Sequence, residues 1–252
     1  MQVRTGDVTA RGIILSAAPQ GEYGRRLSIL TDRFGKITVF AQAAAKPGSR
    51  LVGLTLPMTC AEFTLSRGKN AWNLHGARLI AALSTALSRD FERSCLGMYF
   101  LELLSLFSQE GMEEGEARRL LNLCYLALSA LSGGLYEADL GKETGDGLVR
   151  ALYELRLLVI EGEYTEQPLH PASRGTEALW RHGARARLSD LFAGDLSKRL
   201  FQNIQKQESK GECNSPESFR ETAAAFIREV RSLMKQLVPY KFKSLEVLRE
   251  EG

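Results

Sequence analysis

Basic side chains gather at the predicted turns of the first 80 residues, and few acids accompany them. From position 36 to position 78 there are six Lys or Arg residues and one acid, Glu62. Lys46 and Arg50 begin and end the stretch KPGSR, which holds no carboxylate. Cations without nearby acids are typical of a surface that binds a polyanion, and a phosphate backbone is the polyanion we expect. The predicted DNA contacts are Arg25, Arg26, Arg33, Phe34, Lys36, Lys46, Arg50, Arg67, Lys69 and Trp72.

The aromatic members of this set are chosen because they lie at turns. Phe34 is part of the turn DRFG, and Trp72 follows the turn RGKN. Proteins that bind single strands combine a basic groove with aromatic rings on which bases stack. Phe40 and Phe63 lie in predicted strand interiors, so we expect them in the core.

The net charge changes sign along the chain. Residues 1–80 hold 11 basic and 4 acidic residues, a net charge of +7, whereas the remainder holds 22 basic and 26 acidic residues, a net charge of −4. This division favours a basic module that meets a polyanion. Two alternatives stay open: a merely solvated surface, and an adaptor whose basic barrel binds an acidic protein partner.

The motifs of common enzymes and metal sites are absent from the sequence. There is no Walker loop, G-x-S-x-G, H-E-x-x-H or G-x-G-x-x-G. His75, His170 and His182 have no ligand-like spacing, and the four cysteines include no C-x-x-C pair. We therefore expect neither catalysis nor a bound metal or cofactor. No apolar run approaches the roughly 18 residues that cross a membrane, so a cytoplasmic location is expected.

Short segments rich in β-branched residues and separated by turn residues fill the N-terminal part. Five strands followed by helices predict an α+β protein, in which a small closed OB-fold barrel precedes an all-α domain. The predicted strands are Arg11–Ser16, Arg26–Thr31, Lys36–Gln42, Met58–Ser66 and Ala71–Ile80. We place the domain boundary at residues 81/82.

Helical patterns dominate after this boundary. The predicted helices are Phe91–Phe107 with a cap at Ser84-Thr85, Glu116–Leu131, Gly145–Gly162, Arg187–Lys206, Ser215–Leu237 and a short last helix from Phe242. Ser215 and Pro216 are typical of a helix start. Residues 163–187 are expected to be irregular.

Several segments in order resemble the bacterial recombination mediator family RecO. They are an L-T-D-x-x-G-K hairpin, a loop ending K-P-G-S-R-L, and the helical segments MYFLELLSLF, LYELRLL and PYKFKSLEVL. The resemblance implies binding of single- and double-stranded DNA, annealing of complementary strands, and help in loading RecA onto coated single strands during recombinational repair. It further implies RecR as a partner, no membrane association, and a bacterial cytoplasmic protein that joins the nucleoid during repair.

Two further expectations follow from this resemblance. Many relatives carry a zinc ribbon with two C-x-x-C pairs, whereas residues 163–187 here contain no cysteine. We expect a ribbon-like insertion without metal, packed around Leu179 and Trp180. The helical domain is expected to bind the acidic C-terminal tail of single-stranded DNA-binding protein, in an apolar groove with a cationic rim. The predicted tail-binding residues are Arg150, Leu152, Leu155, Arg156 and Val159.

Overall fold

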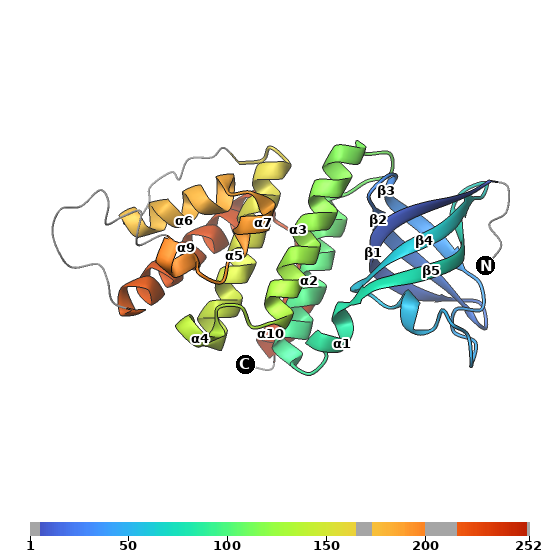
Figure 1. Cartoon of the computed structure of the whole chain (residues 1–252), viewed down its shortest axis with the longest axis horizontal. Coiled ribbons are helices and arrows are strands. Elements are labelled where there is room, and N and C mark those ends of the chain that lie inside the picture. Colours follow the sequence, from blue (N-terminus) through green and yellow to red (C-terminus); the bar gives the residue numbers. More distant parts are fainter. Residues whose placement is uncertain (1–5, 165–172, 200–215, 251–252) are drawn as a thin grey trace. The chain divides into compact units, whose positions relative to one another are not determined.

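The computed structural model describes residues 6–164, 173–199 and 216–250 (Figure 1). The N-terminal part is built from strands, as the sequence predicts. All five predicted strands are confirmed: β1 (Asp7–Gln20), β2 (Gly24–Thr31), β3 (Gly35–Ala41), β4 (Thr59–Arg67) and β5 (Trp72–Ala82), with a single 3-10 turn, η1 (Gly53–Thr55), between β3 and β4.

The five strands close into a barrel in the order β1-β2-β3-β5-β4. All neighbouring strands are antiparallel except β3 and β5, which pair in parallel at Val39↔Trp72 and Phe40↔Asn73. Alternate residues point into the barrel, so that buried and more exposed positions alternate along β3. The predicted α+β class, with an N-terminal OB-fold barrel and a helical remainder, is confirmed.

The helices begin after β5. They are α1 (Leu83–Leu87), α2 (Phe91–Phe107), α3 (Glu114–Ser132), α4 (Glu137–Leu140), α5 (Lys142–Ile160), α6 (Arg174–Arg185), α7 (Leu188–Leu191), α9 (Pro216–Leu237) and α10 (Lys243–Glu250). The predicted helices at 91–107, 116–131, 145–162 and 216–237 are thus confirmed to within a few residues. The cap of α2 is Asp90, whose carboxylate accepts from the Arg93 N–H at 3.1 Å, and the predicted cap at Ser84-Thr85 is wrong.

The segment 163–187 differs most from expectation. Instead of an irregular ribbon, α6 occupies 174–185 and begins at Ser173, whose hydroxyl accepts from the Thr176 N–H at 3.1 Å. Trp180 is buried against Tyr164 and Phe226, so Leu179 and Trp180, which are expected in a ribbon, belong to a helix that packs on α9. Residues 165–172 lie outside the described ranges.

The predicted helix at 187–206 is also wrong in its described part. The chain forms the short α7, then a turn, then a helical segment at 196–199, and residues 200–206 lie outside the described ranges. Ser215, the predicted cap of α9, is outside them too.

The chain divides into two compact units. The first comprises residues 1–125 and 242–252, and the second comprises residues 126–241. Within the first unit, α2 contacts β1 and α10, so this unit continues past residue 81. The predicted boundary at 81/82 marks the change from strand to helix, and its status as a domain boundary stays a prediction. Within the second unit, α5 is buried and contacts α4, α6 and α9.

Candidate nucleic-acid interface

The connection between β3 and β4 carries the acid-free basic stretch, and Arg25 holds this connection in place. The Arg25 Nη1 atom donates to the Val52 carbonyl at 3.0 Å, and to the Thr55 carbonyl and hydroxyl at 3.3 and 2.7 Å. The Ala45 N–H donates to the Tyr23 carbonyl at 2.9 Å, which ties the loop to the β1–β2 turn. Arg25 was predicted to contact DNA, but in the structure its guanidinium positions the loop.

Lys46 and Arg50 are exposed on this loop. Neither forms an ion pair with a described carboxylate, and the same holds for the exposed Arg26 on β2 and Lys69 in the β4–β5 turn. We call these four residues (Arg26, Lys46, Arg50 and Lys69) the open cations of the barrel. They are the members of the predicted set that can receive a phosphate without first losing a partner.

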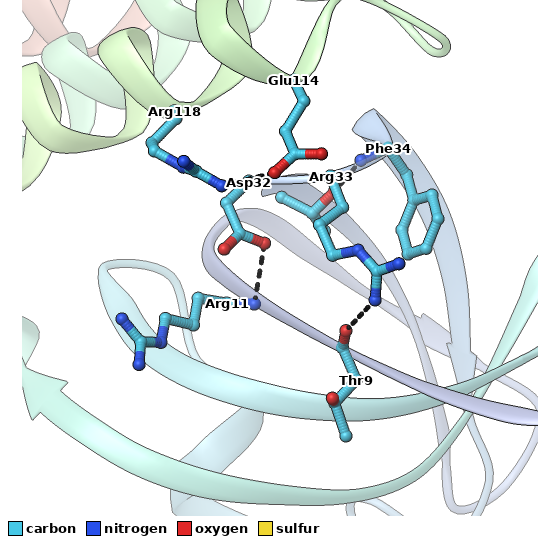
Figure 2. Close-up of polar contacts among 8 residues, drawn as sticks. Thr9, Arg11, Asp32, Arg33, Phe34, Glu114 and Arg118 are labelled. Atoms are coloured by element: carbon cyan, nitrogen blue, oxygen red, sulfur yellow. Dashed lines mark hydrogen bonds and ion pairs between the residues drawn. The ribbon is translucent and has the colours of Figure 1, made fainter.

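The remaining predicted contacts gather at the opposite end of the β2–β3 hairpin, around the turn Asp32–Gly35. Register separates this turn from the β3–β4 connection, because Arg25 pairs with Ala41 at one end of the hairpin and Thr31 pairs with Gly35 at the other. Figure 2 shows Arg33 lying over the Phe34 ring, with its guanidinium donating to the Thr9 carbonyl at 3.1 Å. In the same view Asp32 accepts from the Arg11 N–H at 3.0 Å.

Phe34 and Trp72 stack on each other, with ring centroids 4.7 Å apart. The outer faces are covered by cations, because Arg33 lies 5.3 Å from the Phe34 centroid and Arg67 lies 5.0 Å from the Trp72 centroid. Trp72 is only 7% exposed and belongs to the barrel core. The two rings are therefore not an open platform for bases, and a stacking role for them would require Arg33 or Arg67 to move.

Arg67 and Lys36 are engaged by the chain itself. Arg67 Nη1 pairs with Glu110 Oε1 at 2.7 Å, while Lys36 Nζ donates to the Ser105 carbonyl at the end of α2. Burial lowers the pKa of Lys36. The Lys36 N–H donates to the Gln109 carbonyl at 2.9 Å. Lys36 thus joins the start of β3 to the segment that follows α2, and Arg67 joins the end of β4 to the same segment.

The five predicted tail-binding residues all lie on α5, where the structure places most of them inside the second unit. Leu152 and Leu155 are fully buried, Val159 is half-buried, and Arg150 pairs with Glu154 at 2.7 Å. Arg156 is 7% exposed.

The α5–α6 contact accounts for this burial. Arg156 Nε donates to the Gly183 carbonyl at 2.7 Å, and a Cβ on Gly183 would lie 2.7 Å from a methyl of Leu155. Because α6 covers this side of α5, the predicted open groove with Arg156 at its rim is not found among the described residues. The groove is closed because position 183 is a glycine, and the absence of a side chain there lets α5 and α6 approach closely.

Sequence reasoning missed Ser105, Glu110 and Thr55, which accept from the side chains of Lys36, Arg67 and Arg25, and Gln109, which accepts from the Lys36 backbone N–H. Glu110 lies 43 positions from Arg67, and only the closed barrel brings them together. No local signal marks such partners. The described residues hold no cluster of three or more His, Cys, Asp or Glu side chains that could bind a metal ion, and His170 lies outside them. Within the described ranges, none of the helices is long and apolar enough to span a membrane.

Comparison with known proteins assigns the barrel. The family model described as Recombination protein O N terminal matches residues 1–83. The DNA repair protein RecO of Clostridium perfringens (strain 13 / Type A) is 29% identical over 147 residues, which cover 56% of this chain and 59% of that protein. For RecO of Desulforudis audaxviator the identity is 33%, over 54% of this chain and 55% of that protein.

RecO of Caldicellulosiruptor bescii is 26% identical over 63% of this chain and 60% of that protein. The chain thus spans little more than half the length of the curated relatives it matches. The family model covers the barrel, whose strand order and register were described above. The resemblance is confirmed: residues 1–83 form a Recombination protein O N-terminal domain, in a chain similar to bacterial DNA repair proteins of the RecO family.

Proposed function

We propose that this protein binds DNA through its barrel and serves as a recombination mediator, which anneals complementary single strands and helps to load RecA onto coated DNA. One observation carries the DNA-binding part: the open cations of the barrel (Arg26, Lys46, Arg50 and Lys69) are exposed and have no described carboxylate partner. The similarity to DNA repair proteins named RecO supports the same conclusion.

The loop is suited to this task because it is already shaped before DNA arrives. Arg25 fixes Val52 and Thr55, and the Thr55 hydroxyl in turn donates to the Leu51 carbonyl at 2.8 Å. A loop held in this way loses less conformational freedom on binding than a free one. Annealing requires charge screening and strand proximity, with no bond made or broken, which is consistent with a protein that needs no catalytic group.

The test is to replace Lys46 and Arg50 with alanine together. At 0.1 M salt each lost single-strand phosphate contact weakens binding about fivefold, so we expect a loss of about 25-fold and a salt slope shallower by about 1.4. Binding of a fluorescent single-stranded oligonucleotide at several salt concentrations measures both quantities.

The matched control is Arg118→Ala with Arg181→Ala, which removes the same charge from arginines that are paired with Glu114 and Glu177. This control should leave binding unchanged. Equal affinity of the Lys46/Arg50 double variant and wild type, at unchanged thermal stability, would remove the loop from the interface.

A protein-interaction adaptor remains the second candidate, and one observation favours it. Val52 and Leu56 are 38% and 41% exposed on the same loop as Lys46 and Arg50, as a surface for an acidic and partly apolar protein would need. DNA binding that is weak and independent of salt in the wild type would favour the adaptor.

RecR and the tail of single-stranded DNA-binding protein stay predicted partners. For the tail, the variant to test is Arg150→Ala combined with Glu154→Gln, because Arg150 pairs with the buried Glu154 and the loss of Arg150 alone would leave this carboxylate without its arginine. Arg156 is itself buried and donates to two carbonyls of α6, so its loss would disturb the fold as well. Unchanged affinity for a tail peptide in an anisotropy titration would place the tail elsewhere. We further propose that the protein acts in the bacterial cytoplasm, at the nucleoid during repair.

A further inference from the structure

Helix α9 presents one apolar and one basic face. Its apolar face is buried within the second unit, where α9 contacts α4, α5 and α6. The buried side chains are Phe219, Ala223, Phe226, Val230, Leu233 and Met234. On the other side Arg228, Arg231 and Lys235 are exposed. With 100° per residue, these three cations lie within about 60° of one another, along about 10 Å of helix.

These three cations differ from three other exposed arginines of the described helices. Arg118, Arg181 and Arg199 each pair with an acid four positions earlier. Arg228, Arg231 and Lys235 have no described carboxylate partner. The acid nearest to them in sequence, Glu229, is half-buried and accepts from Trp180 Nε1 at 2.6 Å, and residues 230–241 contain no acid at all.

The spacing makes this arrangement costly for the isolated helix. Arg228 and Arg231 are three positions apart, and Arg231 and Lys235 are four apart, so like charges occupy neighbouring places on the helix surface. Pairs of this kind destabilise a helix. A bound polyanion would offset this repulsion. The unit that holds the helix is neutral overall, since residues 126–241 contain 16 basic and 16 acidic residues.

The basic face of α9 (Arg228, Arg231 and Lys235) suits a nucleic-acid backbone better than a protein. Ser232 and Gln236 are the exposed residues beside these cations, and the exposed Glu221 lies on the same side two turns before Arg228. No large apolar side chain stands beside the three cations to anchor a protein partner. Directly after the helix, Tyr240 is 57% exposed and Lys241 is exposed too, which adds an aromatic ring of the kind on which unpaired bases stack.

We propose that the basic face of α9 is a second binding site for the phosphate backbone of single-stranded nucleic acid, separate from the barrel loop. The inference rests on the proposed function, because a protein that anneals two strands benefits from contacts for each of them. Because six buried side chains fix the helix in the second unit, the three cations stay at a fixed spacing from one another.

The test compares two triple variants of the full chain with the same loss of charge. One is Arg228→Ala, Arg231→Ala and Lys235→Ala; the control is Arg118→Ala, Arg181→Ala and Arg199→Ala. The probe is a fluorescent 30-nucleotide oligo-dT. For the first variant we expect a salt slope shallower by about 2 and, at 0.1 M salt, an affinity up to about 100-fold lower. The control should bind like the wild type.

The outcomes separate this inference from the proposed function. Wild-type protein that fails to bind oligo-dT would refute the proposed function. If wild type binds and both triple variants match it, the α9 site is refuted while the barrel proposal stands. Titration with poly-glutamate tests the alternative that the basic face of α9 binds an acidic protein. If the α9 variant no longer binds poly-glutamate but binds oligo-dT like the wild type, the partner is an acidic protein and our assignment is overturned. Unchanged unfolding temperature shows that the α9 variant is folded.

Discussion

Replacing Gly35 with alanine should release the barrel from the segment after α2. Gly35 has φ +68°, a left-handed conformation, and a Cβ there would lie 2.2 Å from the Gln109 carbonyl oxygen and 2.9 Å from Met112 Cγ. The left-handed backbone alone costs alanine about 1 kcal/mol. Relief of the clash separates the β2–β3 turn from residues 109–112. The hydrogen bond from the Lys36 N–H to the Gln109 carbonyl at 2.9 Å and the one from the Gly111 N–H to the Phe34 carbonyl at 3.1 Å are then lost, at about 1 kcal/mol each. The total is about 3 kcal/mol.

Gly48→Ala is the matched control, because Gly48 has φ +77° and no atom within 4 Å of its would-be Cβ. It carries the backbone cost without the clash, so a loss of about 1 kcal/mol is expected. Urea unfolding followed by tryptophan fluorescence measures both, with Trp180→Phe as a common background so that Trp72 reports on the barrel. Equal losses for the two alanine variants would refute the reasoning that Gly35 is required by its neighbour across the contact.

Three further predictions concern the second unit and metal content. Arg156→Ala should destabilise the protein by about 3 kcal/mol in urea unfolding, because two carbonyls of α6 lose a charged donor, and Arg156→Lys should not restore it, since an ammonium lacks the fork of a guanidinium. Burial chiefly lowers the pKa of His182 from its ordinary 6.5, so the unfolded chain takes up the proton more readily. The free energy of unfolding should therefore be at its full value above about pH 6.5 and fall as the pH drops below it. His182→Gln should reduce this pH dependence. A variant whose stability depends on pH as strongly as that of the wild type would contradict the prediction. Metal analysis should find no stoichiometric zinc, and one zinc per chain would show that His170 and His182 form a site with neighbouring acids.

The strands could be predicted because each carries its own signal. Alternation of apolar and polar residues along β3, with Gly35 at the preceding turn, identifies a half-buried strand without knowledge of its neighbours. The same logic placed α2, α3, α5 and α9. The prediction of an irregular stretch at 163–187 is wrong for 174–185, because its polar and glycine residues hide the repeat of Thr176, Leu179, Trp180 and Gly183 at helical spacing. The ribbon expected there came from the resemblance and not from the pattern.

The site could be predicted only in part. Lys46 and Arg50 stand on a loop without acids, and a composition argument is sufficient for them. Whether a cation is available depends on partners distant in sequence, such as Glu110 for Arg67. Likewise Phe34 and Trp72 meet only because β3 and β5 pair across the closure of the barrel, which no periodicity within either segment reveals.

That closure has a kinetic consequence. The barrel is sealed by the pairs Val39↔Trp72 and Phe40↔Asn73, whereas β2 and β3 share seven residue pairs. Fewer backbone hydrogen bonds must break to open this seam than to separate β2 from β3, so its free energy of local opening is lower. The barrel should therefore open locally first between β3 and β5. Among Val39, Phe40, Trp72 and Asn73, the amide protons that donate across the β3–β5 seam should exchange with deuterium faster than those at the centre of β2. The barrel is thus continuous in its fold but unequal in its dynamics, with its most labile edge between β3 and β5.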